Sequence, residues 1–132
     1  MVFSVNDRFE KKFKVSRKIQ QGFIELFEDN NLLHTNEDFA KGKGFSGCVM
    51  HGNILNGFLS YLIGECLPTK EVIIHSQEIQ FKQPVYMDDE LKLEATVRDI
   101  HESVNAVEFS FRFRNKDSKV VAKGNFQIGL LI

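Results

Sequence analysis

The sequence predicts an α+β domain in which one antiparallel sheet wraps around a single long central helix. Residues 54–67 carry a wide apolar stripe at helical spacing, and the second half of the chain alternates apolar with polar residues. With 132 residues, 42% hydrophobic and 27% charged, the chain suits one globular domain over residues 1–132. A net charge of −1 argues against nucleic-acid binding.

The N-terminal part predicts a strand followed by a helix. In residues 8–15, Phe9 and Phe13 share one parity, which is typical of a half-buried strand. Ser16 can cap the next helix, whose apolar residues continue at helical spacing as far as Phe27. Further on, Asn36 can cap a short helical turn that the glycines of "GKG" would end.

The stretch "VMHGNILNGFLSYLIGECLP" predicts a helix that is buried on most sides. Its apolar residues recur at i, i+3 and i+4 steps: Ile54, Leu55, Phe58, Leu59, Leu62, Ile63, Cys66 and Leu67. Pro68 would end this helix. It has fewer than twenty residues and includes His51 and Glu65, so it is no membrane span.

The second half predicts an antiparallel meander with one apolar face. "EVIIHSQEIQFKQ" is rich in β-formers, apolar residues alternate in 91–97, 107–113 and 120–130, and "NKDS" makes a turn. The exposed edges of such a sheet favour pairing between subunits, so we expect at least a homodimer.

Cysteine usage and the N-terminus indicate a cytoplasmic protein. Cys48 and Cys66 form no metal-binding pattern, and we expect both to be free, buried thiols in a reducing compartment. The first fifteen residues are charged throughout and contain neither a signal-peptide core nor a membrane span.

The segment "DNNLLHT" presents two alternatives. Two adjacent Asn disfavour a helix, so we expect a loop. Asp29 and His34 are either an acid–base pair or an ordinary polar loop with a chance Asp and His. The paired leucines favour a loop that Leu32 or Leu33 holds against the core.

A second candidate is the His-Gly step at the start of the buried helix. The Gly52 N–H is free of helical partners and could stabilise a developing thioester oxyanion, or the glycine could serve only a tight loop. We expect His51 to be a structural histidine with its hydrogen bonds satisfied. Ser60, about two helical turns after Gly52, could bond a catalytic group or its own helix.

Together these residues resemble a known family. "FIELFEDNNLLHTNEDFAKGKGFSGCVMHGNILNGFLS" is similar to the motif of MaoC-like (R)-specific enoyl-CoA hydratases and acyl dehydratases. The resemblance implies a hot-dog fold, an acid–base pair of Asp29 and His34, an oxyanion hole at Gly52 and a supporting role for Ser60. The sequence departs from the motif twice, with Leu32 in place of the usual Pro and Cys48 in place of the usual Arg.

The activity that the resemblance implies is reversible hydration of trans-2-enoyl thioesters, carried on CoA or acyl carrier protein. This chemistry needs no metal and no redox cofactor, and we expect neither nucleic acid nor a membrane as a partner. The acyl tail is expected beside the central helix, along Phe58, Leu59 and Leu62. Two alternatives remain open: a thioesterase that uses Glu65 to activate water, and a non-catalytic acyl-thioester binding module.

Overall fold

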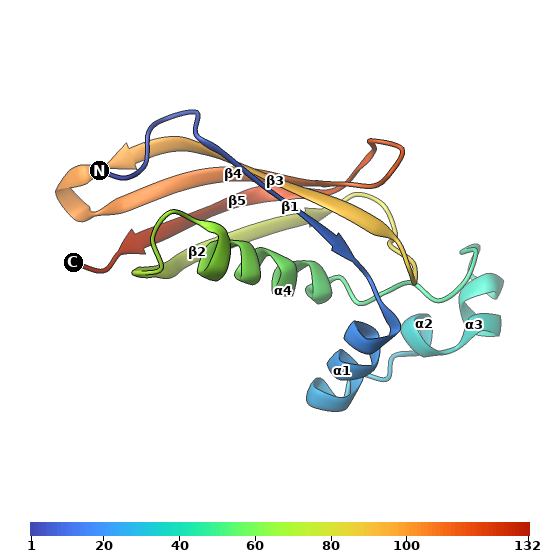
Figure 1. Cartoon of the computed structure of the whole chain (residues 1–132). Helices are drawn as coiled ribbons and strands as arrows, with labels where there is room; N and C mark the ends of the chain where they lie inside the picture. Colours follow the sequence, from blue (N-terminus) through green and yellow to red (C-terminus); the bar gives the residue numbers. More distant parts are fainter.

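The computed structural model describes all 132 residues and shows a curved five-stranded sheet with helix α4 along its inner face (Figure 1). The elements are β1 (Arg8–Lys14), α1 (Arg17–Phe27), α2 (Leu32–Thr35), α3 (Glu37–Gly42), α4 (Asn53–Tyr61), η1 (Leu62–Cys66), β2 (Val72–Phe81), β3 (Glu90–His101), η2 (Glu102–Val104), β4 (Ala106–Arg114) and β5 (Val120–Leu130). The prediction of an antiparallel sheet around a central helix is confirmed.

The strand order is β1-β3-β4-β5-β2, and every neighbouring pair is antiparallel. Strands β3, β4 and β5 form the predicted meander. Strand β2 pairs with β5 rather than with β3, so the chain crosses the sheet between β2 and β3. Consequently β1 and β2 are the two edges of the sheet.

The core is built mainly on Phe, Leu and Val side chains from the inner face of the sheet and from α4. Leu91, Leu93, Ala95 and Val97 of β3 are all at most 2% exposed, as their alternation predicts. The rings of Phe109 and Phe126, on neighbouring strands, stack with centroids 4.5 Å apart.

The central helix differs from the prediction in its second half. Its α-helical geometry ends at Tyr61, and residues Leu62–Cys66 continue as a π-helix. Gly64 within this segment and Pro68 after it both weaken α-helical continuation. None of the helices combines the length and the apolar character needed to span a bilayer.

Helices α1 to α3 project from one end of the sheet (Figure 1). Their predicted caps are present: the Ser16 hydroxyl accepts from the Ile19 N–H at 3.2 Å, and the Asn36 side chain accepts from the Phe39 N–H at 2.9 Å. The prediction that "DNNLLHT" is all loop is wrong in its second half. Leu32–Thr35 form one helical turn, because the Asn31 side chain caps it by accepting from the Leu33 N–H at 2.9 Å.

Candidate active site

Asp29 stands where α1 has just ended. Glu28 adopts the left-handed conformation, with φ of 57°, and its N–H donates to the Ile24 carbonyl at 2.8 Å. This cap turns the chain away from the helix axis. The Asp29 carboxylate is exposed, and its Oδ1 accepts from the Asn31 N–H at 3.3 Å. This local turn holds the carboxylate in place and leaves Oδ2 free to accept another hydrogen bond.

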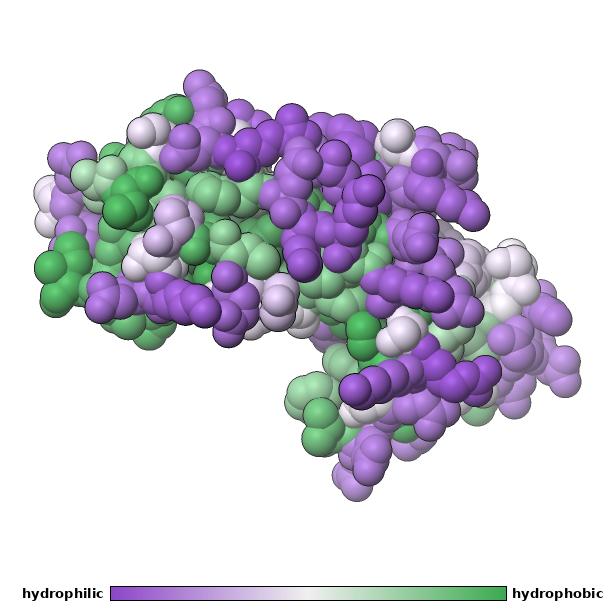
Figure 2. Space-filling view, in the orientation of Figure 1, coloured by the Kyte–Doolittle hydropathy of each residue, from purple (hydrophilic) through white to green (hydrophobic).

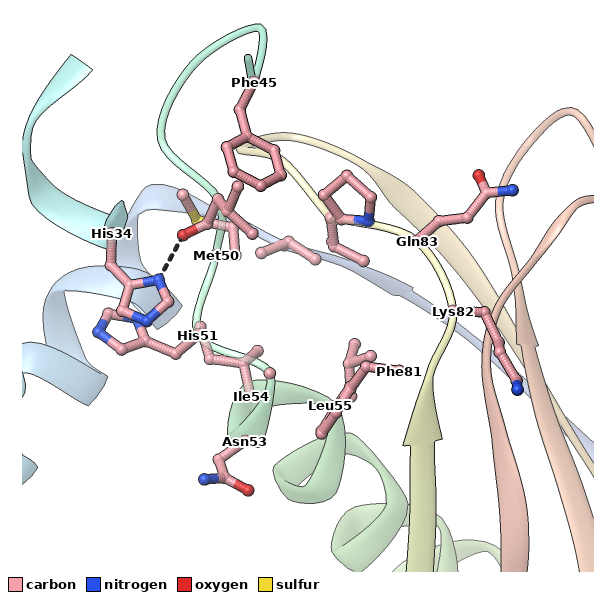
Figure 3. A pocket seen from close by; sticks show the side chains of 15 residues that line it. His34, Phe45, Met50, His51, Asn53, Ile54, Leu55, Phe81, Lys82 and Gln83 are labelled. Carbon is pink, nitrogen blue, oxygen red and sulfur yellow. Dashed lines mark hydrogen bonds between the residues drawn. The ribbon is translucent and has the colours of Figure 1, made fainter. Parts of the chain in front are cut away.

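His34 lies half-buried in α2, and its tautomer follows from its contacts. Its Nδ1 is 2.6 Å from the Val49 carbonyl oxygen, drawn as the dashed line in Figure 3. A carbonyl oxygen only accepts, so the neutral ring carries its proton on Nδ1 and leaves Nε2 with a free lone pair. The backbone carbonyl of His34 accepts from Gln20 Nε2 at 3.1 Å, which ties α2 to α1. The ring nitrogen of His34 that can accept a proton is therefore Nε2.

His51 contacts both Asp29 and His34. It is 3% exposed, and its Nε2 donates to the Asp29 backbone carbonyl at 3.0 Å. Its ring lies 4.1 Å from the His34 ring, centroid to centroid. The expectation of a structural histidine fits, but its hydrogen bonding is incomplete, because the buried Nδ1 has no partner.

The structure brings Asp29, His34 and His51 together, with one donor atom of each within 4.8 Å of the others. A carboxylate and an imidazole at this separation can share a water molecule or exchange a proton through it. Two imidazoles and a carboxylate could also hold a transition-metal ion. The proton-transfer chemistry of the pair needs no such ion.

Gly52 begins α4 beside this pair. Its N–H donates to no protein group, so it is available to a ligand at the positive end of the helix. A Cβ at this position would lie 2.9 Å from two ring atoms of Phe81. Both alternatives for this glycine are therefore compatible with the structure: the residue allows close packing and also offers a free donor.

His34 and Gly52 line one cavity of about 470 Å³. Figure 3 shows its walls, with Phe45 and Met50 on the loop before α4 and Phe81 at the end of β2. Eight of the fifteen lining residues are hydrophobic. The polar groups include the Gly52 amide and the side chains of His34, His51, Asn53, Lys82 and Gln83. The cavity thus brings together an imidazole nitrogen with a free lone pair, a free backbone N–H and a largely apolar wall.

Several predicted site residues lie elsewhere. A second hollow of about 1110 Å³, called the groove below, lies between α1 and α4 and is bordered by Asp29. Ser60 is exposed on α4 and lines neither the cavity nor this groove. Leu59 and Leu62 are both 0% exposed in the core, whereas Phe58 borders the groove. Glu65 is exposed and forms an ion pair with Lys70 at 2.8 Å, away from the cavity.

The loop before the His-Gly step is anchored by Glu37 of α3. Its carboxylate accepts from the Cys48 N–H at 3.4 Å, at the position where the family motif usually has Arg. Partial burial raises the pKa of the Cys48 thiol above its ordinary value, and the negative charge of Glu37 adds to the rise. Cys48 and Cys66 are both free, as expected, but each is only partly buried.

The sequence reasoning missed residues that reach the site from distant elements. Phe81 and Val85 line the cavity, although they follow the motif by more than twenty residues. The role of His51 as a bridge between Asp29 and His34 was also missed. The sequence offered only one sign of this role, which is the position of His51 directly before Gly52. The contacts of His51 with Asp29 and His34 depend on how the end of α1 packs against the loop before α4.

Comparisons with known proteins show the family of the chain. A model of the MaoC-like domain matches residues 6–115. The (R)-specific enoyl-CoA hydratase of Aeromonas caviae is 35% identical over 95 residues, covering 72% of this chain and 69% of that protein. A mitochondrial 3-hydroxyacyl-[acyl-carrier-protein] dehydratase of Solanum lycopersicum is 30% identical over 105 residues, covering 78% of this chain and 62% of that protein.

The fold matches a solved structure over almost its whole length. The (R)-hydratase from A. caviae involved in PHA biosynthesis superposes with a TM-score of 0.90 at 26% identity, covering 97% of each chain. The prediction of a hot-dog fold, a sheet wrapped around one central helix, is confirmed.

Proposed function

The chain belongs to the family of MaoC-like domains, and from this premise we propose that it catalyses the reversible hydration of trans-2-enoyl thioesters to (R)-3-hydroxyacyl thioesters. The observation that carries the proposal is the Asp29–His34 pair beside the free N–H of Gly52. The names of the two relatives support a thioester substrate, one on CoA and the other on acyl carrier protein.

The geometry supports a simple sequence of bond changes. Asp29 and His34 hold a water molecule, and His34 Nε2 takes one of its protons as the oxygen bonds to C3 of the enoyl group. The C2–C3 π pair moves towards the thioester carbonyl, whose developing negative charge accepts a hydrogen bond from the Gly52 N–H. Protonated His34 then gives this proton to C2, which completes the addition of water and regenerates the neutral ring, and the reverse steps give dehydration. No metal or redox cofactor takes part.

The two alternative functions have less support. A thioesterase would need a carboxylate such as Glu65 near the thioester, but Glu65 pairs with Lys70 on the surface. A non-catalytic binding module would not need an acid–base pair beside a free amide. Ser60 is exposed, and its hydroxyl contacts no catalytic group in this structure. Its supporting role therefore stays a prediction.

One assay separates the three functions. Incubation with crotonyl-CoA should remove the enoyl absorbance without releasing free thiol. Release of thiol would favour a thioesterase, and binding without either change would favour a binding module.

We also propose a homodimer or higher homo-oligomer. Strand β2 is a ten-residue edge strand that exposes apolar side chains, with Ile73 and Phe81 each 52% exposed. An unpaired apolar edge of this length favours pairing with another chain. Sedimentation at micromolar concentration should give a mass above the 15.2 kDa of one chain, and a stable monomer would contradict the proposal.

For localisation we propose the cytoplasm, because both cysteines are free. The net charge of −1 gives no reason to expect a nucleic-acid partner, and no membrane partner is proposed.

A further inference from the structure

Asp29, His34 and His51 form a cluster with the composition of a transition-metal site. One ring nitrogen of each histidine and one carboxylate oxygen of Asp29 lie within 4.8 Å of one another. Two imidazoles and one carboxylate are the protein ligands of several zinc and iron sites, which keep further positions open for solvent. The proposed hydration uses the side chains of Asp29 and His34 and gives no chemical role to the ring of His51.

Both histidines hold their rings as metal-binding histidines do. A histidine that binds a metal through one nitrogen usually donates the N–H of the other nitrogen to a carboxylate or a backbone carbonyl, which fixes the tautomer. His34 Nδ1 donates to the Val49 carbonyl at 2.6 Å, and His51 Nε2 donates to the Asp29 carbonyl at 3.0 Å. Each neutral ring therefore keeps one free lone pair, on Nε2 of His34 and on Nδ1 of His51.

The free nitrogen of His51 is the observation that points to a ligand. His51 is 3% exposed, and its Nδ1 is buried without a hydrogen-bond partner. A buried acceptor without a partner is costly and rare, and a bound ion or water is a common reason for one. The neighbouring ring of His34, 4.1 Å away between centroids, offers only another lone pair (Figure 3).

The number of acceptors favours a cation over a water molecule. Asp29, His34 and His51 each present a free acceptor, whereas one water molecule has only two protons to donate. A water held by Asp29 and His34 has used both protons, so His51 Nδ1 stays without a partner. A single cation can take all three ligand atoms at once.

The cluster is covered on one side and open on the other. The Phe23 ring packs against the His51 ring with centroids 4.6 Å apart, and this apolar contact keeps water from that side. Apolar surroundings strengthen the attraction between a cation and a carboxylate. The exposed side chain of Asp29 borders the groove between α1 and α4, where Figure 2 shows the surface hollowed, so an ion can reach it from solvent.

We propose that Asp29, His34 and His51 bind a first-row transition-metal ion of the Zn²⁺ type, and that the bound ion inhibits the enzyme. The ligand atoms are His34 Nε2, His51 Nδ1 and a carboxylate oxygen of Asp29, with solvent in the remaining position. The ion occupies the lone pair of His34 Nε2 that the proposed hydration needs for its proton, so the two uses exclude each other. The inhibition rests on the proposed function, whereas the metal site does not.

A second cluster of the same residue types provides the matched control. Asp99, His101 and Glu108 also have one donor atom each within 4.8 Å of the others. This cluster has one histidine instead of two, and His101 Nε2 already lies 3.5 Å from a carboxylate oxygen of each acidic residue. It has no buried nitrogen without a partner, so we expect it to bind Zn²⁺ weakly.

The test is isothermal titration of Zn²⁺ into the full chain after treatment with EDTA and dialysis. A Cys48→Ser, Cys66→Ser background keeps the free thiols from binding the ion, and we expect one tightly bound ion per chain. Loss of an outer partner of a metal ligand already weakens affinity about 10–100-fold, so His51→Phe and Asp29→Asn should each weaken binding by at least about 100-fold. His101→Ala should bind as the parent does.

Folding of each variant is checked by circular dichroism. His51→Phe keeps a ring of similar size beside Phe23 but loses the hydrogen bond to the Asp29 carbonyl. Asp29→Asn changes only an exposed side chain, so it tests the site even if the buried replacement fails to fold.

Hydration of crotonyl-CoA gives the second measurement. Zn²⁺ should abolish the activity of the parent and of His101→Ala in proportion to the occupancy found by titration, and excess EDTA should restore it. Mg²⁺ at the same concentrations should have no effect, because it prefers oxygen ligands.

The outcomes separate the metal site from the proposed function. Absence of Zn²⁺ binding, or binding that persists in both His51→Phe and Asp29→Asn, would overturn the metal site. Loss of binding in His101→Ala would place the ion at the other cluster and overturn it as well. If Zn²⁺ binds as expected but the metal-free parent does not hydrate crotonyl-CoA, the metal site stands and the proposed function is wrong. Zn²⁺ binding with an unchanged hydration rate would overturn the inhibition.

Discussion

Replacing His34 by alanine tests the proton-transfer role most directly. The substitution removes the Nε2 lone pair and the 2.6 Å hydrogen bond from Nδ1 to the Val49 carbonyl. Loss of one such bond costs about 1 kcal/mol of stability, and His34 is only half-buried, so the fold should persist. A placed acid–base group contributes about 10²–10⁴-fold in rate, which corresponds to about 2.7–5.5 kcal/mol of transition-state stabilisation.

We therefore expect His34→Ala to lower kcat on crotonyl-CoA by about 10²–10⁴-fold, measured as loss of the enoyl absorbance. Asp29→Asn should fall in the same range, because it removes the charge that holds the water. The control is His101→Ala. The His101 ring lies 3.5 Å from the carboxylates of Asp99 and Glu108, and His101 does not line the cavity. It should stay within about twofold of the parent. Near-native activity of either site variant in a folded protein would refute the assigned roles.

Three further predictions follow from single contacts. Gly52→Ala should lower kcat by about 10²–10³-fold, because the alanine Cβ would crowd the free N–H at this position. The fold should be retained, since the half-exposed ring of Phe81 can move away from the new Cβ. An unchanged kcat would remove Gly52 from the proposed mechanism. Leu62→Ala should cost about 2–5 kcal/mol in chemical denaturation, because the side chain is fully buried, and a loss below about 1 kcal/mol would contradict that burial. In a Cys66→Ser background, the rate of Cys48 alkylation should increase at a higher pH than for an ordinary thiol, because the pKa of Cys48 is raised. Glu37→Gln should shift this increase in alkylation rate to lower pH. An unchanged pH profile in that variant would argue against the effect of Glu37.

Local patterns predicted most of the elements because their causes are local. The alternation in residues 107–113 places Phe109, Phe111 and Phe113 on one face whatever the neighbouring strand is. Ser16 and Asn36 cap helices through bonds to residues three positions away. Asn31 shows the limit of such reasoning, since the same side chain that disfavours a helix interior stabilises a helix start.

Features that depend on distant contacts could not be predicted in this way. The position of β2 beside β5 is a property of the whole sheet. Phe81 enters the cavity only because β2 ends beside the start of α4. Ser60 was placed near the pair because two helical turns return to a similar face, but the buried face of α4 is turned towards the sheet and leaves Ser60 exposed.

The arrangement of the two histidines explains why so small a site can hold its geometry. Each ring donates one N–H to a backbone carbonyl, His34 to Val49 and His51 to Asp29, and these carbonyls belong to two different loops. The His51 ring packs against the His34 ring, so neither imidazole can rotate without losing a contact to the other. The tautomer of the base and the position of the carboxylate are thus fixed by the same loop-to-loop packing. That packing leaves the lone pair of His34 Nε2 free, as the proposed proton transfer requires, and it holds the Asp29 side chain within 4.8 Å of the histidine nitrogens.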